Sequence, residues 1–101
     1  MTYLRLYQSA VDPADVAEMH RLFVDDVVPA FAERPGCLGI ELTVAVEPNA
    51  GGLVEGAAIS RWSSLDEMAA AMASHDVQEA LVRVRTLLRQ EPVSKVLRVL
   101  S

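Results

Sequence analysis

The chain has 101 residues, a formal net charge of −5, and 51% hydrophobic against 23% charged residues. This length predicts one domain over residues 1–101, and the apolar content exceeds what a small monomer readily hides, so part of it is expected in a subunit interface. The negative charge argues against nucleic acid and membrane surfaces as partners and favours a small-molecule ligand. The single cysteine, Cys37, allows no internal disulfide, and no signal peptide or long apolar run is seen, so a cytoplasmic protein is expected.

The first predicted strand covers residues 2–8, where side chains alternate between two faces. Leu4 and Leu6 lie on one face, and Tyr3, Arg5 and Tyr7 lie on the other. We expect the leucine face to pack against the helices. The tyrosine and arginine face is then expected at a subunit interface, where these residue types are common.

A helix is predicted to follow, because Asp12 can cap a helix whose first turn holds Pro13. Apolar residues recur at spacings of three and four from Val16 through Met19, Phe23 and Val27 to Phe31. Pro29 falls inside this pattern and removes one backbone hydrogen bond, so a kink or break is expected there.

The second half of the chain predicts a hairpin, two helical pieces and a last strand. Alternating residues 38–46, a turn-rich loop at 47–52 and residues 53–62 read as two antiparallel strands. A capping box at Ser64 and Glu67 begins a helix. A bend near His75 then precedes a second helical piece capped by Asp76 with Glu79, and residues 93–100 form the final strand.

The order β-α-β-β-α-β predicts a ferredoxin-like α+β fold with a four-stranded antiparallel sheet and its helices on one side. The other face of such an apolar sheet needs a cover, because exposed apolar strands aggregate. A second copy hides the same patch on both subunits. We therefore expect a homodimer in which two subunits form a dimeric α+β barrel.

Three short motifs resemble the antibiotic biosynthesis monooxygenase family of dimeric α+β barrels: PGCLG at 35–39, RWSSLDE at 61–67 and SHDV at 74–77. The resemblance implies a pocket between the sheet and the helices. Members of this family include cofactor-free oxygenases of aromatic polyketides. Trp62 matches the family tryptophan at the strand end. Four residues earlier the oxygenases carry an amide, where this chain has Ala58.

Another branch of that family binds and degrades heme. It carries an asparagine near the end of the first strand, where this chain has Leu6, Tyr7 and Gln8. It also carries a histidine ligand in the second helical region, to which His75 roughly corresponds. Heme binding or degradation is therefore a third possibility, beside an oxygenase and a binding protein.

Trp62 and His75 are the predicted catalytic residues. Trp62 can wall a pocket and donate its N–H to a ligand, although core packing explains it equally well. His75 can act as the base that removes a phenolic proton, although a lone histidine is more often a cap or a solvent-facing residue.

The predicted substrate-binding residues are His20, Phe23, Met68 and Met72, on or beside the apolar helix faces. For the two methionines, plain core packing is the alternative. No metal site and no cofactor are expected. The sequence thus predicts a cofactor-free monooxygenase-like protein for a small phenolic or quinol compound, with a non-catalytic dimeric ligand-binding or accessory protein as the alternative that Ala58 favours.

Overall fold

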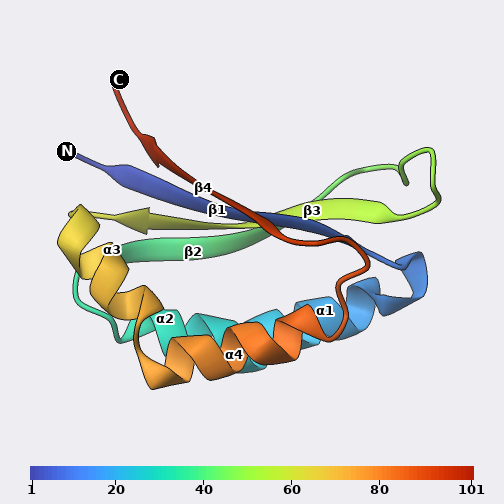
Figure 1. Ribbon diagram of the computed structural model, residues 1–101, viewed down its shortest axis with the longest axis horizontal. Helices are drawn as coiled ribbons and strands as arrows, with labels where there is room; N and C mark the ends of the chain where they lie inside the picture. The colour runs from blue at the N-terminus through green and yellow to red at the C-terminus, as the bar shows by residue number, and fades with distance from the viewer.

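An antiparallel sheet with the strand order β2-β3-β1-β4 forms one layer of the protein, in a computed structural model that describes residues 1–101. The strands are β1 (Tyr3–Val11), β2 (Cys37–Val44), β3 (Val54–Trp62) and β4 (Val93–Arg98). All helices lie on one side of this sheet, and the other side carries none (Figure 1). The predicted ferredoxin-like α+β fold is confirmed.

The helical layer contains two segments. The first runs through a 3₁₀ turn, η1 (Pro13–Asp15), then α1 (Val16–Leu22), a π-helical turn, η2 (Phe23–Val27), and α2 (Val28–Ala32). The second consists of α3 (Leu65–Met72) and α4 (His75–Arg85). The predicted bend near His75 thus corresponds to the junction between two helices.

The first helical segment begins at an aspartate cap and continues through Pro29. The Asp12 carboxylate accepts a hydrogen bond from the Ala14 backbone N–H at 2.9 Å, as expected of a cap. At Pro29 the structure shows no break. A π-helical turn precedes the proline, in which the Val28 N–H reaches the Phe23 carbonyl. The wider turn accommodates a residue that has no N–H of its own and whose ring crowds the preceding turn.

The turn before β2 is fastened to the start of α3. Gly36 has a φ of 79°, and its carbonyl accepts a hydrogen bond from the Ser63 N–H at 2.9 Å. A Cβ added to Gly36 would lie 2.6 Å from the Glu67 carboxyl carbon. Half of the predicted capping box forms, since the Glu67 N–H donates to the Ser64 hydroxyl at 3.2 Å. The Glu67 carboxylate accepts from the Ser63 and Ser64 hydroxyls instead of from the Ser64 backbone N–H.

The two faces of β1 are the reverse of the prediction. Tyr3 pairs across the sheet with Trp62, and both Tyr3 and Tyr7 pack against the buried core beneath the helices. Leu4 and Leu6 therefore point to the helix-free face. Alternation along a strand separates two faces but does not say which one the helices cover, and here both rows are apolar enough for either place.

Several element boundaries also differ from the prediction. β1 extends to Val11, three residues past its predicted end. β2 ends at Val44, two residues early, and Val46 is fully exposed beyond it. β4 ends at Arg98. α4 begins at His75, after Ser74, whose side chain makes no cap bond to the helix, so Asp76 lies in the first turn instead of capping it.

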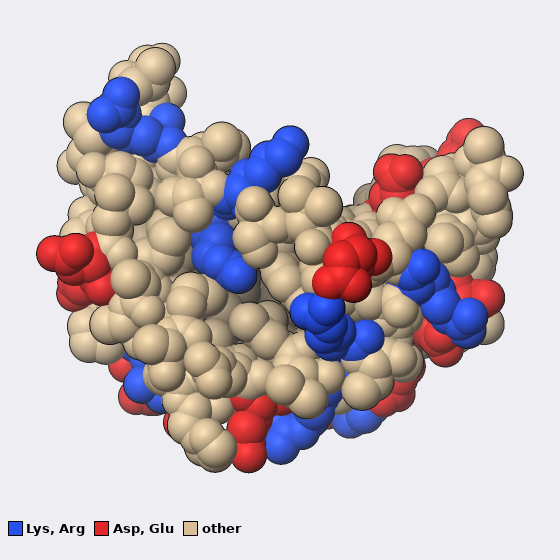
Figure 2. All heavy atoms as spheres, in the orientation of Figure 1, with Lys and Arg blue, Asp and Glu red and all other residues tan.

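The helix-free face has an apolar centre. Leu4 pairs with Leu97 of β4, and Leu6 pairs with Ile59 of β3, which places these four side chains on one surface. Every residue of β4 is exposed. This side of the molecule is also hollowed between the end of β4 and the β2–β3 loop (Figure 2).

We predict that Gly36→Ala lowers the free energy of unfolding by about 1–3 kcal/mol, because alanine is strained at this φ and its Cβ collides with Glu67. Gly51→Ala is the matched control. Gly51 has no positive φ, and its added Cβ meets only Asn49 Oδ1 at 3.5 Å, so its effect is expected within about 0.5 kcal/mol. Urea unfolding measures both, and equal losses would contradict the account of this turn.

Candidate functional site

The space between sheet and helices is closed at one end by a pair of aromatic rings. Trp62 is 0% exposed and Phe31 is 2% exposed, with ring centroids 6.1 Å apart and planes tilted by 54°. The Trp62 Nε1–H donates to the buried Ser60 hydroxyl at 2.8 Å. Both the ring and the N–H of Trp62 therefore have partners inside the core.

A pocket lies toward the other end of the same space. Its lining on β3 stops at Ala58, short of Trp62. The lining comprises 17 residues, 14 of them hydrophobic. These are Tyr7, Ser9, Ala10, Val11, Met19, Phe23, Val27, Leu42, Thr43, Val44, Val54, Gly56, Ala57, Ala58, Leu81, Val84 and Leu88.

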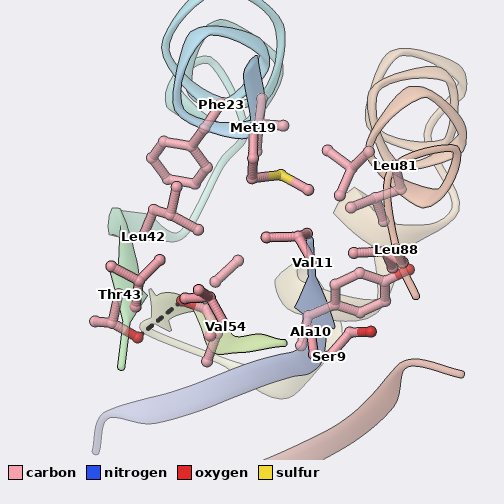
Figure 3. Close-up of a pocket in the computed structure, with 17 residues that line it drawn as sticks. Ser9, Ala10, Val11, Met19, Phe23, Leu42, Thr43, Val54, Leu81 and Leu88 are labelled. Atoms are coloured by element: carbon pink, nitrogen blue, oxygen red, sulfur yellow. Dashed lines mark hydrogen bonds between the residues drawn. The ribbon is translucent and has the colours of Figure 1, made fainter. Parts of the chain in front are cut away.

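The helices form the roof of this pocket and the sheet forms its floor. In Figure 3, Met19 and Phe23 point inward from the first helical segment, and Leu81 points inward from α4, toward Leu42 and Val11 on the strands. The void between them is about 50 Å³. A cavity of about 150 Å³ accepts benzene in a protein core, so a ring-sized ligand requires the lining side chains to move apart.

Three lining residues carry a side-chain hydroxyl, and two of those are already engaged. Ser9 donates to the Gln90 carbonyl at 2.7 Å, and Thr43 donates to the Ala57 carbonyl at 3.1 Å. The Tyr7 hydroxyl forms no hydrogen bond within the chain. Its hydroxyl is therefore the polar group of the lining that is free to meet a ligand.

The neighbour of Tyr7 on the same strand face is a half-buried arginine. The Arg5 guanidinium carbon lies 5.5 Å from the centre of the Tyr7 ring, and an Arg5 N–H donates to the Ser94 hydroxyl at 3.3 Å. Burial lowers the pKa of Arg5, since removal from water disfavours the charged form. A cation thus stands beside Tyr7, one of the residues that line the pocket.

The structure disperses the residues that sequence reasoning selected. Phe23 lines the pocket. Trp62 and Met68 are buried in the core outside the lining, and His20 is exposed on α1. Met72 is partly buried and packs on the core.

His75 is on the helix that supplies Leu81 and Val84 to the lining, but it does not line the pocket itself. Its side chain is 81% exposed at the first turn of α4, with Nε2 at 3.2 Å from a Glu79 carboxylate oxygen. The catalytic roles of His75 and Trp62 stay predictions, and the structure brings neither side chain to the pocket.

Sequence reasoning missed Tyr7 and Met19 as lining residues. Tyr7 had been assigned to the opposite face, and Met19 was recognised only as part of an apolar stripe. The signal that could have found Tyr7 was the strand register. Tyr3 pairs with Trp62, and Tyr7 lies on the same face of β1 as Tyr3, so Tyr7 lies on the same side of the sheet as Trp62.

No group of three or more His, Cys, Asp or Glu side chains is arranged to hold a metal ion. No helix is both long and apolar enough to cross a membrane.

A helix-covered antiparallel sheet with an apolar pocket between its layers defines the protein as a ferredoxin-like α+β protein. More particularly, it has the fold of the antibiotic biosynthesis monooxygenase-like proteins. The sequence matches no family model and no curated protein.

Three solved structures illustrate the likeness. A Caulobacter crescentus protein named for antibiotic biosynthesis monooxygenases has 21% identity and a TM-score of 0.78, over 99% of this chain and 91% of its own. SnoaB of Streptomyces nogalater, a cofactor-independent oxygenase, has 19% identity and a TM-score of 0.76, over 99% and 94%. Rv0793 of Mycobacterium tuberculosis has 18% identity and a TM-score of 0.72, over 100% and 97%.

We predict that Trp62→Phe lowers the free energy of unfolding by about 1–3 kcal/mol, since it leaves the buried Ser60 hydroxyl without its partner. Ser60→Ala is expected to cost a similar amount. The double variant should lose less stability than the sum of the two single losses, because both partners of the hydrogen bond are then gone. Denaturant unfolding measures this coupling, and strictly additive losses would show that the hydrogen bond contributes nothing.

Proposed function

We propose that this protein binds a small, largely apolar aromatic compound between its sheet and helices and acts on it as a cofactor-free monooxygenase-like enzyme for phenolic or quinol compounds. The observation that carries the proposal is the pocket itself, with 14 hydrophobic residues among 17 and one free hydroxyl at Tyr7. Apolar walls with few polar groups suit an aromatic ring bearing an oxygen. The fold shared with SnoaB, a cofactor-independent oxygenase, supports the reaction class.

Oxygenation without a cofactor makes three demands on a protein. The site must exclude water, hold the substrate in place and accept its proton, while the electrons come from the substrate. The apolar lining meets the first demand. The Tyr7 hydroxyl can hold the ligand oxygen, and so contributes to the second.

A non-catalytic ligand-binding protein is the second candidate, and the third demand favours it. The lining contains no histidine, aspartate, glutamate, lysine or cysteine to act as the base. The predicted base, His75, is exposed elsewhere. An enzyme of this geometry would have to pass the proton to solvent, either directly or through the Tyr7 hydroxyl, which would give up its own proton to water as it accepts the substrate's.

The ligand-binding prediction uses two matched methionines. Met19→Ala enlarges the pocket, whereas Met68→Ala opens space in the core away from it. Both variants should lose about 2–4 kcal/mol of stability, as buried methionines do on truncation. Only Met19→Ala is expected to bind 1-naphthol more tightly than the wild type, as measured by calorimetry.

Oxygen uptake with a panel of hydroquinones and naphthols then distinguishes the oxygenase from the binding protein. The wild type and its variants are first stripped of metal. Uptake that Tyr7→Phe diminishes and His75→Ala leaves unchanged would support an oxygenase worked from this pocket. Saturable binding without uptake would support the binding protein. Identical naphthol affinities for both methionine variants and the wild type would contradict the assigned pocket.

We also propose that the protein is a homodimer joined through the helix-free face of its sheet. Leu4, Leu6, Ile59 and Leu97 give that face an apolar centre, and burying it between two copies removes it from water. Arg61 and Glu41 flank Ile59 on the same face, so a two-fold axis can bring opposite charges together.

For the dimer, we predict that sedimentation equilibrium gives twice the chain mass for the wild type at micromolar concentration, and that Leu97→Glu shifts the protein to monomer. Leu97 is 45% exposed, so the change should leave the monomer folded. Val82→Glu is the control, at a 64% exposed position on α4, and should remain dimeric. A wild-type monomer would exclude the proposed interface.

A further inference from the structure

Arg5 differs from the other arginines in its surroundings. Arg21, Arg34, Arg83 and Arg85 each lie within 4.0 Å of a carboxylate. Arg5 forms no ion pair, although it is half-buried. The remaining arginines without an acidic partner, Arg61, Arg89 and Arg98, are exposed and can rely on water.

The hydrogen-bonding capacity of Arg5 is largely unused within the chain. A guanidinium has five N–H donors, and Arg5 places one of them on a protein acceptor, the Ser94 hydroxyl. The Tyr7 ring, at 5.5 Å, adds a cation–π contact without using a donor. A partly desolvated cation with free donors favours the approach of an anion.

The position of Arg5 joins the pocket to the edge of the sheet. Arg5 and Tyr7 share the helix-side face of β1, and Tyr7 lines the pocket. Across the strand pair, Arg5 stands opposite Val96, which is 53% exposed on β4. A ligand with its ring in the pocket can therefore leave a polar group at Arg5, where solvent has access.

We propose that Arg5, together with the hydroxyls of Tyr7 and Ser94, binds the negatively charged group of an aromatic acid whose ring occupies the pocket. The inference rests on the proposed function, because it assigns the charge of the same ligand. It narrows the substrate class from phenols in general to those bearing a carboxylate or a comparably acidic oxygen.

The chemistry of the three groups suits this role. A planar guanidinium meets a carboxylate with two parallel hydrogen bonds, which fixes orientation as well as charge. The free Tyr7 hydroxyl can donate to the same group. The lining beyond Tyr7 is almost wholly apolar, so the acid group is favoured at Arg5 and Tyr7, and the ring is favoured inside the pocket.

The test compares 1-naphthoate with 1-naphthylmethanol, which share a ring system and differ in charge, by calorimetry at low ionic strength. The wild type should bind the acid about 10- to 100-fold more tightly, as expected for a hydrogen-bonded charge pair. Arg5→Met should abolish this preference. Arg21→Met, which removes the same charge from an exposed position on α1, should retain it.

Two further measurements keep the test independent of folding effects. Arg5→Lys, with circular dichroism as a check on folding, should retain a smaller preference for the acid. In the wild type, the preference should shrink as salt is raised, because the pair is partly exposed. Equal affinity for acid and alcohol, or a preference that survives Arg5→Met, would overturn the inference and leave the proposed pocket standing; failure of both compounds to bind would overturn both.

Discussion

The contact between Trp62 and Phe31 sets the distance between the sheet and the helices at one end of the molecule. At that end two large rings are buried in the space between the two layers. Farther along β3 the residues facing the helices are Ala58 and Gly56, which fill little of it. The pocket is thus a result of a gradient in side-chain size along one strand. Gly56 is fixed in this role, since an added Cβ would lie 2.6 Å from the Thr43 carbonyl oxygen of the neighbouring strand.

The pocket and the charge beside it give the site two chemically distinct parts. For the proposed ligand, the apolar part would select a flat, apolar ring by volume and contact. The polar part, around Tyr7 and Arg5, would select by hydrogen bonding and orientation. Such a division explains how a chain with net charge −5 can still offer an anion a local cationic place, because potentials at half-buried sites depend on nearby groups more than on the total.

Local signals in the sequence predicted the order of the elements and several of their ends. The Asp12 and Ser64 caps, the hairpin and the bend near His75 all arise from interactions within a few residues. The face of β1 that meets the helices was assigned wrongly, because alternation is symmetric between two apolar rows. The location of the pocket depends on which residues of distant elements meet, and no spacing rule along one helix places Met19 opposite Leu42.

Trp62 is the only tryptophan in the chain, and it is wholly enclosed beside Phe31 and Ser60. Its indole is therefore a built-in optical reporter of the core. Its fluorescence senses loss of packing at the closed end of the molecule, while the lining of the pocket stops short of it. Emission from the native protein can therefore follow the unfolding of the core in an unlabelled sample, without a reporter group placed in the site itself.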